Sequence, residues 1–523
     1  MLDLTWLDLL VIAVYLLSIV VLGFWVGRGE RNATDYFLAG RSLPWYLIGL
    51  SFYASNMSGA SFVGLMGAAY EEGMVVFNYE WTATVVLIVF ALAMLPAFLR
   101  AGLFTLPEYL ERRFDRRCRW AYAGLTLVTM LFIDMAGAIY AGSVVFTTLF
   151  PAIGLWEASA AMALLTGAYT LVGGLRSVVV TDALQAVLII AGAAMICAFG
   201  LSEVGGWSGL TAALDDSQRM LFRPADDGFL PWPGLGGVLL LGFYYWALNQ
   251  YFAQRALAAR SLREGQRGLL FAGLLKLPNL FLMIVPGMVA MVLLPGLESP
   301  DQAFPALIAR LLPEGLRGLI LTALVAAIMS SLDSALNAAA SLLTMDFVQP
   351  LRPSLSGRSL LRIGRVFTAI LILIAALYAP AIERFGSLFQ YFQATLAYVV
   401  PPVVAVYLGG LFSSRFTAAG AFWALAGGIS TGLALFVAKE VLGLWVAAGL
   451  PPVHFTYMAM AIFVIAFAIM AAISRFAPAA AMESLPMARR SDLFGRAFGG
   501  WSDSRLLAAA LALVLVGLLL ALA

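Results

Sequence analysis

The stretch ALVAAIMSSLDSALNAAASLLTMDF, residues 323–347, places a row of small polar side chains in an otherwise apolar segment. A helix turns by about 100° per residue, so Ser330, Ser334, Asn337 and Ser341, spaced i, i+4, i+7 and i+11, lie on one side of it. Asp333 falls within the same arc, and the other faces carry Ala, Leu, Ile and Met. Small residues allow membrane helices to pack closely, but packing does not explain a carboxylate. We therefore expect a membrane helix whose polar side faces a ligand.

The composition of the whole chain indicates a polytopic membrane protein. Of its 523 residues, 62% are apolar and 11% are charged, whereas soluble proteins have about 45–50% and about 25%. A net charge of +2 gives no reason to expect a nucleic-acid partner. Two cysteines and one histidine argue against a disulfide framework and against histidine or cysteine metal chemistry. No nucleophile motif is present, so we expect no enzyme.

Fourteen segments are apolar and long enough to be membrane spans, each of which needs about 20 residues. They are residues 5–26, 43–70, 75–99, 121–150, 157–173, 178–202, 235–256, 270–296, 316–346, 361–380, 387–411, 417–440, 453–474 and 504–523. We expect the first to stay as a helix and not to be a cleaved signal peptide, because it starts with Asp3 and Asp8 and its basic residues follow the apolar stretch.

The distribution of basic residues predicts the orientation of these spans. With the N-terminus outside, 24 of the 31 Lys and Arg residues fall in inner loops, as the positive-inside rule requires. We therefore expect an inner (plasma) membrane protein with both termini on the extracytoplasmic side. Arg255 counts among the inner-loop residues, so no arginine is expected at membrane depth. The longest loops are 203–234 outside, a possible lid, and 475–503 inside.

We expect five ionisable residues at membrane depth, away from the ends of their spans: Glu80, Asp134, Asp182, Lys276 and Asp333. Each costs about 2.5–3.5 kcal/mol in the hydrocarbon, and such residues usually mark a transport pathway. Hard cations bind oxygen ligands, and the hydroxyls of 323–347 with one or two carboxylates supply oxygens without excess charge. These residues predict a site for a small monovalent cation.

Two of the expected spans contain weak points. The segment SFYASNMSGASFVG, residues 51–64, has no strong helix former between 55 and 59, and Gly242 precedes Tyr244, Tyr245 and Trp246 in the span 235–256. Irregular backbone at membrane depth survives only where it lines protein or a cavity. Two interrupted spans, five spans apart, indicate inverted repeats and a binding site at the midplane. The repeats would be residues 43–202 and 235–411.

Seven motifs in this order resemble the sodium:solute symporter family, especially its sodium/galactose and sodium/glucose branch. They are DYFLAGRSLPWYLIGLSFYASN (35–56), FNYEW (77–81), TLPEYLERRF (105–114), GGL-x5-TDALQ (173–185), YYWALNQYFAQRALAARS (244–261), SSLDSALNAAASLLTMDF (330–347) and FQYFQ (389–393). The resemblance implies an all-α LeuT-like fold with a ten-helix core of two inverted five-helix repeats. One helix, in 1–42, would precede the core, and three, in 412–523, would follow it. It also implies alternating access driven by Na⁺.

The resemblance also implies site residues. A first sodium site would use carbonyls of Ala54, Met57 and Ala327 with hydroxyls of Ser330 and Ser331. A possible second site would use Asp182 and Ser334, with Asp333 where relatives often carry Ser or Thr. Residues expected to bind the solute are Asn56, Ser61, Glu80, Asp134, Tyr245, Lys276 and Gln393.

The implied activity is sodium-coupled import of a neutral sugar-like solute, such as glucose or galactose. An amide, a carboxylate and an ammonium together suit a neutral ligand with many hydroxyls. The alternatives are a sodium symporter for a cyclitol, sialic acid or an amino acid, and a transporter-like membrane sensor. Oligomeric state and the number of coupled ions are open at this point.

Overall fold

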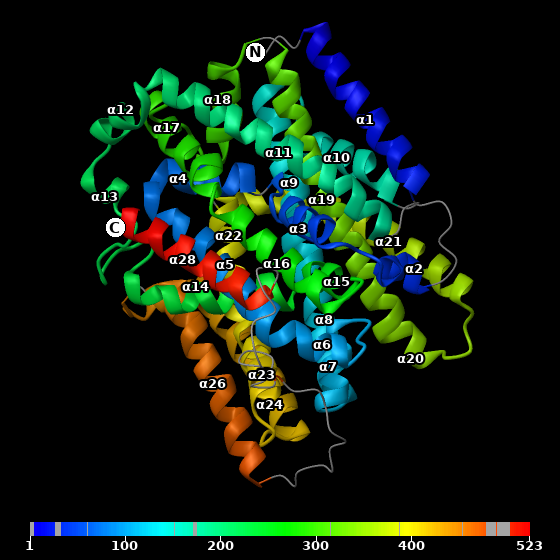
Figure 1. Cartoon of the computed structure of the whole chain (residues 1–523). Helices are drawn as coiled ribbons and strands as arrows, with labels where there is room; N and C mark the ends of the chain where they lie inside the picture. Colours follow the sequence, from blue (N-terminus) through cyan, green and yellow to red (C-terminus); the bar gives the residue numbers. More distant parts are fainter. Residues whose placement is uncertain are drawn as a thin grey trace.

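The computed structural model describes residues 5–26, 33–59, 61–150, 152–170, 175–313, 315–385, 387–451, 453–476 and 503–522, together with Ala488. The connection 27–32 and most of the expected inner loop 475–503 lie outside these residues. Every regular element in the described ranges is helical (Figure 1). The expected all-α architecture is therefore confirmed.

The helices of the first half lie between residues 6 and 203. They are α1 (Trp6–Val26), α2 (Ala33–Leu38), α3 (Trp45–Asn56), α4 (Met66–Glu72), α5 (Asn78–Val89), α6 (Leu95–Arg100), α7 (Leu106–Arg113), α8 (Arg116–Thr129), α9 (Ala136–Leu149), α10 (Leu155–Thr170) and α11 (Leu175–Glu203). Short 3-10 or π-helical segments join several of them: η1 (Ala39–Arg41), η2 (Ser61–Leu65), η3 (Gly73–Phe77), η4 (Phe90–Met94) and η5 (Met130–Met135).

The remaining helices follow from residue 206 onward. They are α12 (Gly206–Ala213), α13 (Asp216–Arg219), α14 (Leu235–Gly242), α15 (Gln250–Leu257), α16 (Leu262–Lys276), α17 (Val285–Leu293), α18 (Ala303–Leu311), α19 (Leu316–Leu342), α20 (Gln349–Leu351), α21 (Gly357–Tyr378), α22 (Leu388–Val399), α23 (Pro401–Phe412), α24 (Ala418–Phe436), α25 (Leu444–Ala447), α26 (Phe455–Phe476) and α28 (Ser504–Leu522). The short segments here are η6 (Trp232–Gly234), η7 (Phe243–Leu248), η8 (Leu280–Ile284), η9 (Pro300–Gln302), η10 (Leu343–Val348), η11 (Ala379–Phe385) and η12 (Val437–Val441).

The number of membrane-length helices is lower than the expected fourteen. Within the described residues, nine helices are long and apolar enough to cross a membrane, or up to 11 if two bent pairs each count as one span. The expected spans 43–70 and 235–256 are not continuous, because the first is interrupted at Met57 and the second at Asn249. Of the expected span 157–173, the described residues lie in α10, Leu155–Thr170, and residues 171–173 lie outside the described ranges. The count of fourteen thus stays a prediction, and local breaks explain most of the difference.

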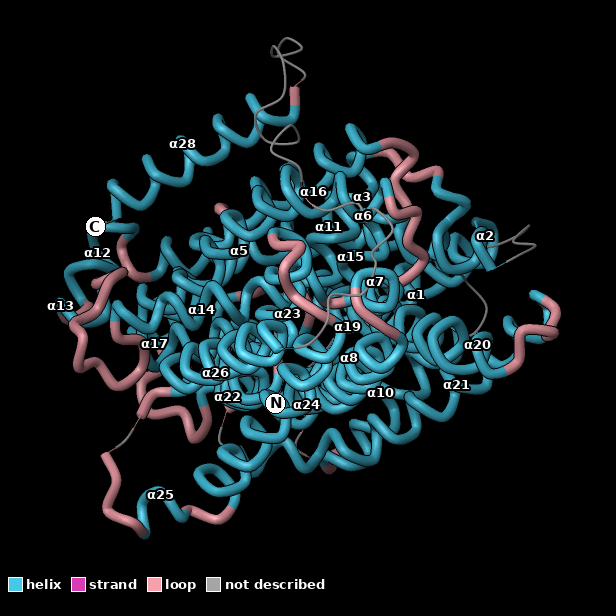
Figure 2. The backbone as a smooth tube through the Cα atoms, turned by 90° about the horizontal axis from the view of Figure 1, so that it is seen from below, coloured by secondary structure: helices cyan, strands magenta, loops and turns pink. Residues whose placement is uncertain are grey.

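The polar helix of residues 323–347 lies at the centre of the bundle. Its continuous helical stretch, Leu316–Leu351, is the most buried of the membrane-length segments, with 94% of its most apolar window inside the structure. Within it, α19 packs against α1, α3, α9 and α11. By contrast, α1 lies at the edge of the bundle in Figure 1, and α28 lies at its edge in Figure 2. The serine row therefore faces other helices and not lipid.

The break in the first interrupted span occurs where the sequence predicts it. Helix α3 ends at Asn56, and Met57 leaves the helical region with ψ 66°. The helix resumes in η2 at Ser61. The second break differs from the expectation, because the chain continues past Gly242 in the π-helical η7 and leaves the helical region at Asn249, where ψ is 127°. The side chain of Asn249 caps α15 by accepting from Tyr251 N, so a capping residue and not a glycine sets this break.

The segment 203–234 closes one side of the central region. Arg223 forms an ion pair with Glu72 at 2.6 Å, and Asn78 donates to the carbonyl of Leu221 at 2.6 Å. The ring of Phe229 stacks on that of Phe389, with centroids 5.9 Å apart. The segment is thus anchored to α4 and α5 and contacts α22.

Candidate functional site

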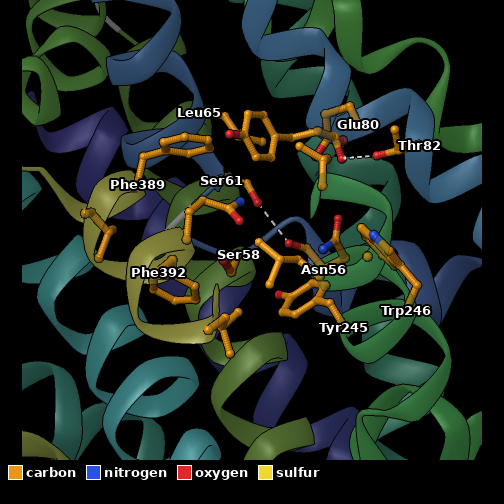
Figure 3. Close-up of a pocket in the computed structure, with 17 residues that line it drawn as sticks. Asn56, Ser58, Ser61, Leu65, Glu80, Thr82, Tyr245, Trp246, Phe389 and Phe392 are labelled. Carbon is orange, nitrogen blue, oxygen red and sulfur yellow. Dashed lines mark hydrogen bonds between the residues drawn. The ribbon is translucent and has the colours of Figure 1, made fainter. Parts of the chain in front are cut away.

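A cavity lies beside the α3 break, bounded by η2, α5, η7 and α22 (Figure 3). Its volume is about 100 Å³. Five residues that the sequence predicts to bind a solute line it: Asn56, Ser61, Glu80, Tyr245 and Gln393. The structure thus brings together side chains from positions as distant as 56 and 393. It also adds lining residues that the sequence analysis did not select: Ser58, Tyr79, Thr82, Phe389 and Phe392.

The polar wall of the cavity is held by a buried ion pair. Lys276 Nζ lies 2.9 Å from Glu80 Oε2 and also donates to Asn56 Oδ1. The Lys276 side chain is 1% exposed and does not line the cavity. Its charge offsets the desolvation of Glu80, because a buried ion is tolerated when it is paired and hydrogen-bonded. Lys276 therefore orients Asn56 and Glu80 from behind.

Asn279 is a member of this cluster that the sequence analysis missed. It donates to Glu80 Oε2 and accepts a hydrogen bond of 2.8 Å from the hydroxyl of Tyr53. The signal was present, because Asn279 follows Lys276 at i+3, the spacing of neighbouring side chains on one helix face. The carboxylate of Glu80 therefore accepts hydrogen bonds from two side chains, those of Lys276 and Asn279.

The aromatic floor of the cavity is formed by η7. Tyr245 and Trp246 both line the cavity, and their rings meet edge to face with centroids 5.2 Å apart. The Lys276 ammonium lies 4.5 Å from the centroid of the Trp246 ring, a cation–π distance. Phe52 stacks against the same ring, 6.1 Å between centroids. Aromatic faces of this kind suit the apolar face of a ring-shaped solute.

Asp134, which the sequence analysis placed among the solute-binding residues, lies behind this floor. The hydroxyl of Tyr251 is 3.4 Å from Asp134 Oδ1 and 3.2 Å from the hydroxyl of Tyr245. Asp134 itself does not line the cavity. In this arrangement Asp134 contacts the floor through Tyr251 and does not reach a solute.

The expected first cation site lies where the α3 break meets α19. The backbone carbonyls expected to bind the cation belong to Ala54, Met57 and Ala327, and all three residues are fully buried. The hydroxyl of Ser331 lies 2.9 Å from the carbonyl of Ala327 and 3.1 Å from that of Ser55. It therefore bridges the broken helix and α19. Ser330 instead donates to Asp182 Oδ1 at 2.5 Å.

The expected second cation site contains an arginine. Arg255 Nη2 lies 2.9 Å from Asp182 Oδ2 and also donates to Ser334 Oγ. The sequence analysis assigned Arg255 to a loop, and that assignment is wrong, because the residue lies in helix α15 and is fully buried. Asp182 makes this burial possible by neutralising the guanidinium, and Ser51 accepts from Arg255 Nε at 2.6 Å. A cation at Asp182 and Ser334 would have to displace Arg255.

Asp333 is buried on α19, with 1% exposed. The residues on either side of it, Leu332 and Ser334, are buried as well, so this part of α19 lies inside the bundle.

Comparison with known proteins identifies the family. The model of the sodium:solute symporter family matches residues 36–428, most of the chain. This chain is a member of the sodium:solute symporter family. It is 34% identical over 451 residues to the sodium/glucose cotransporter of Vibrio parahaemolyticus, covering 80% of this chain and 83% of that protein. It is 35% identical over 488 residues to sodium/glucose cotransporter 2 of Rattus norvegicus, covering 83% and 72%.

Solved structures of symporters share the fold of this chain. A Na⁺-coupled sialic acid symporter in a substrate-bound outward-open state aligns with a TM-score of 0.80 and 23% identity, over 92% of this chain and all of that one. Mhp1, a nucleobase-cation-symport-1 family transporter, aligns with a TM-score of 0.57 and 13% identity, over 86% and 97%. The chain is therefore a multi-pass membrane transporter with a LeuT-like fold, and it is a sodium-coupled symporter, not an enzyme.

Proposed function

We propose that this symporter imports a neutral, polyhydroxylated solute of the hexose class, driven by the inward sodium gradient. The observation that carries the proposal is the cavity in which Asn56, Glu80 and Gln393 meet above the aromatic side chain of Tyr245. An amide offers both a donor and an acceptor, and a carboxylate offers acceptors only. Such a set matches hydroxyls, each of which donates one hydrogen and accepts others. The sugar cotransporters among its relatives support the same class of solute.

The position of the buried charges supports a neutral solute over an acidic or a cationic one. Arg255, which could pair with the carboxylate of an acidic solute, is paired with Asp182 and does not line the cavity. Glu80 is paired with Lys276, and Asp134 lies behind the floor. The cavity therefore carries no uncompensated charge from these groups. This argues against sialic acid and amino acids, whereas a cyclitol stays within the proposed class.

We propose that one sodium ion binds between Ala54, Met57 and Ala327, through their carbonyl oxygens, and the hydroxyls of Ser330 and Ser331. Support comes from the Ser331 contacts, which already join the two elements that would hold the ion. The second site at Asp182, Asp333 and Ser334 has weaker support, because Arg255 occupies the space between two of its members.

Coupling in this proposal follows from the order of residues along the chain. Asn56 lines the cavity, and Met57, the next residue, lies at the proposed sodium site. An ion that fixes the carbonyl of Met57 against α19 also fixes the side chain of Asn56 toward the solute. Each ligand therefore pre-organises the site of the other, and thermodynamic linkage makes the effect reciprocal.

We further propose that the protein lies in the plasma membrane with both termini on the extracytoplasmic side, and that residues 43–202 and 235–411 form inverted repeats. The charge count supports the orientation, and the two broken helices, one early in each half, support the repeats. The segment 203–234 would then close the cavity from outside through Phe229 and Phe389.

Uptake into proteoliposomes tests the proposal. Labelled glucose and galactose should accumulate under an inward sodium gradient and not under an equal potassium gradient. Unlabelled hexoses and cyclitols should compete, whereas sialic acid and charged amino acids should not. Uptake that is independent of sodium would contradict the coupling. Binding without any accumulation would favour the sensor alternative.

A further inference from the structure

Helix α21 presents one side to the bundle and the other outward. The helical stretch Gly357–Phe385 has the length of a membrane span, and only 28% of its most apolar window is buried inside the structure. The buried residues of α21 recur every three or four positions: Leu360, Gly364, Thr368, Leu371 and Ala375. They form one face, on which α21 packs against neighbours that include α19 and η10. Figure 2 shows α21 at the edge of the molecule.

The outward side of α21 changes from basic to apolar along the helix. Arg358, Arg362 and Arg365, spaced i, i+4 and i+7, are all exposed and share one face. From Val366 onward the large exposed side chains of α21 are apolar: Val366, Ile370, Leu373, Ile374 and Leu377. A face of this kind suits a helix whose first turns lie among lipid headgroups and whose later turns lie in the hydrocarbon.

A neighbouring tryptophan places this basic end at the membrane–water interface. Trp120 of α8 is 37% exposed and donates to the carbonyl of Asp346 in η10 at 3.2 Å. A Cβ added to Gly364 of α21 would lie 3.4 Å from Oγ1 of Thr344, which is also in η10. Trp120 and the basic end of α21 therefore flank the same short segment. Because Trp is enriched at the level of lipid headgroups, we place the arginines at that level.

The charge of these arginines is not compensated within the described part of the chain. The side chains of Arg358, Arg362 and Arg365 form no hydrogen bond or ion pair with any residue there, and neither does that of Arg352, which is exposed just before the helix. No acid occurs between Asp346 and Glu383. Asp346 is itself paired with Arg119 at 2.6 Å. The start of α21 therefore carries a positive charge that complements an anion.

We propose that this face of α21 binds an anionic phospholipid, with the phosphate at Arg362 and one of its neighbours and the acyl chains along the apolar turns that follow. Arg362 lies one turn from both Arg358 and Arg365, so two guanidiniums can reach one phosphate. A guanidinium pairs with phosphate through two parallel hydrogen bonds. Four basic residues beside a membrane helix are typical of sites for acidic lipids. The apolar continuation of the same face favours a lipid over a soluble anion.

Such a lipid would act on the helix that carries the proposed sodium site. Helix α21 packs against α19, which bears Ser330 and Ser331, and against η10 at the end of α19. The ion pair of Asp346 with Arg119 joins η10 to α8. A lipid that holds α21 in place therefore stabilises the packing around this end of α19, and so it stabilises the folded state.

The test uses the full-length protein in dodecyl maltoside, incubated with equimolar phosphatidylglycerol and phosphatidylcholine, with bound lipid counted by native mass spectrometry. One basic residue at a membrane surface contributes about a fivefold preference for an anionic lipid. Two arginines at one phosphate should therefore give wild type about a 25-fold preference for phosphatidylglycerol. Arg362→Gln should lower this preference about fivefold, and the triple variant with Arg358→Gln and Arg365→Gln should abolish it. Arg415→Gln, which removes an exposed arginine between α23 and α24, is the matched control and should leave it unchanged.

Thermal unfolding separates loss of the lipid from loss of the fold. Without added lipid, the triple variant should unfold at the same temperature as wild type, because its three arginines are exposed and unpaired. Phosphatidylglycerol should raise the unfolding temperature of wild type and of Arg415→Gln, but not that of the triple variant. An excess of inorganic phosphate should not displace the lipid.

Three results would overturn the proposal. The first is equal retention of the two lipids by wild type. The second is a loss of preference in Arg415→Gln as large as that in Arg362→Gln, because net charge and not the α21 face would then be the cause. The third is displacement of the lipid by inorganic phosphate, which would make the arginines a site for soluble anions.

Discussion

Removal of Arg255 gives the sharpest test of the buried charges. The side chains of Arg255 and Asp182 are 1% and 0% exposed, and their charged atoms are 2.9 Å apart. Arg255→Met leaves a carboxylate in the protein interior without its cation. Breaking a buried pair in this way costs about 3–5 kcal/mol. The hydroxyls of Ser51 and Ser330 still donate to Asp182, so we expect a loss of about 3 kcal/mol, the lower end of this range.

The free energy of unfolding can be measured by SDS titration in dodecyl maltoside micelles, followed by tryptophan fluorescence. Asp182→Asn should destabilise by a similar amount, because it leaves the guanidinium buried without an anion. The double variant should lose less than the sum of the two, with a coupling of at least about 2 kcal/mol. Arg365→Met on α21, an exposed control, should change stability by about 0.5 kcal/mol or less. Additive effects of the two single substitutions would refute the ion pair.

Three further predictions concern the solute, the loop before α18 and the helix contact. Gln393→Ala should raise the half-saturating solute concentration about tenfold, since it removes a hydrogen bond to the solute. Gln390→Ala, which changes an exposed residue on the same helix, should leave that concentration unchanged. Uptake kinetics that are equal in the two variants would contradict the role of Gln393. Burial raises the pKa of Asp301, in the connection between α17 and α18, to about 7, although Leu388 N donates to it. The folded state therefore binds more protons than the unfolded state between about pH 4 and 7. The free energy of unfolding should thus fall as pH rises through this range, by up to about 4 kcal/mol. If the dependence of this free energy on pH were unchanged in Asp301→Asn, the Asp301 carboxyl would not be its source. Gly268→Ala should destabilise the folded protein by about 1–3 kcal/mol, because the added Cβ would overlap Ile48. Gly124→Ala should leave stability unchanged, because no atom lies within 4 Å of the added Cβ. Thermal unfolding of the two variants tests this difference.

The sequence predicted the features that depend on local composition. Ser, Asn and Gly, which are weak helix formers, occupy four of the five positions from 55 to 59, and the helix ends there at Asn56. The row of hydroxyls in residues 323–347 predicted a helix whose polar side faces away from lipid. The structure agrees, because α19 lies at the centre of the bundle and is buried. The family motifs then placed Asn56, Glu80, Tyr245 and Gln393, which share one cavity.

Features that depend on distant partners escaped the sequence analysis. A count of basic residues treats every arginine as a loop residue, but Arg255 is buried because Asp182, 73 residues earlier, compensates its charge. One local feature was also missed, because the second break lies at Asn249, whose side chain caps α15, and not at Gly242. Asp134 was expected in the cavity, but the intervening Tyr251 keeps it behind Tyr245.

The central claim is that the Ser331 contact between the α3 break and α19 couples sodium to the solute. The most direct measurement is the dissociation constant of the solute, by calorimetry on purified protein, with sodium exchanged for potassium. Sodium should tighten solute binding by about 5–150-fold in wild type, the usual range of such coupling, and by less than about twofold in Ser331→Ala. The Ser341→Ala variant, a buried serine on the same helix, should behave as wild type. Equal affinities in sodium and potassium for wild type, or unchanged coupling in Ser331→Ala, would contradict the account.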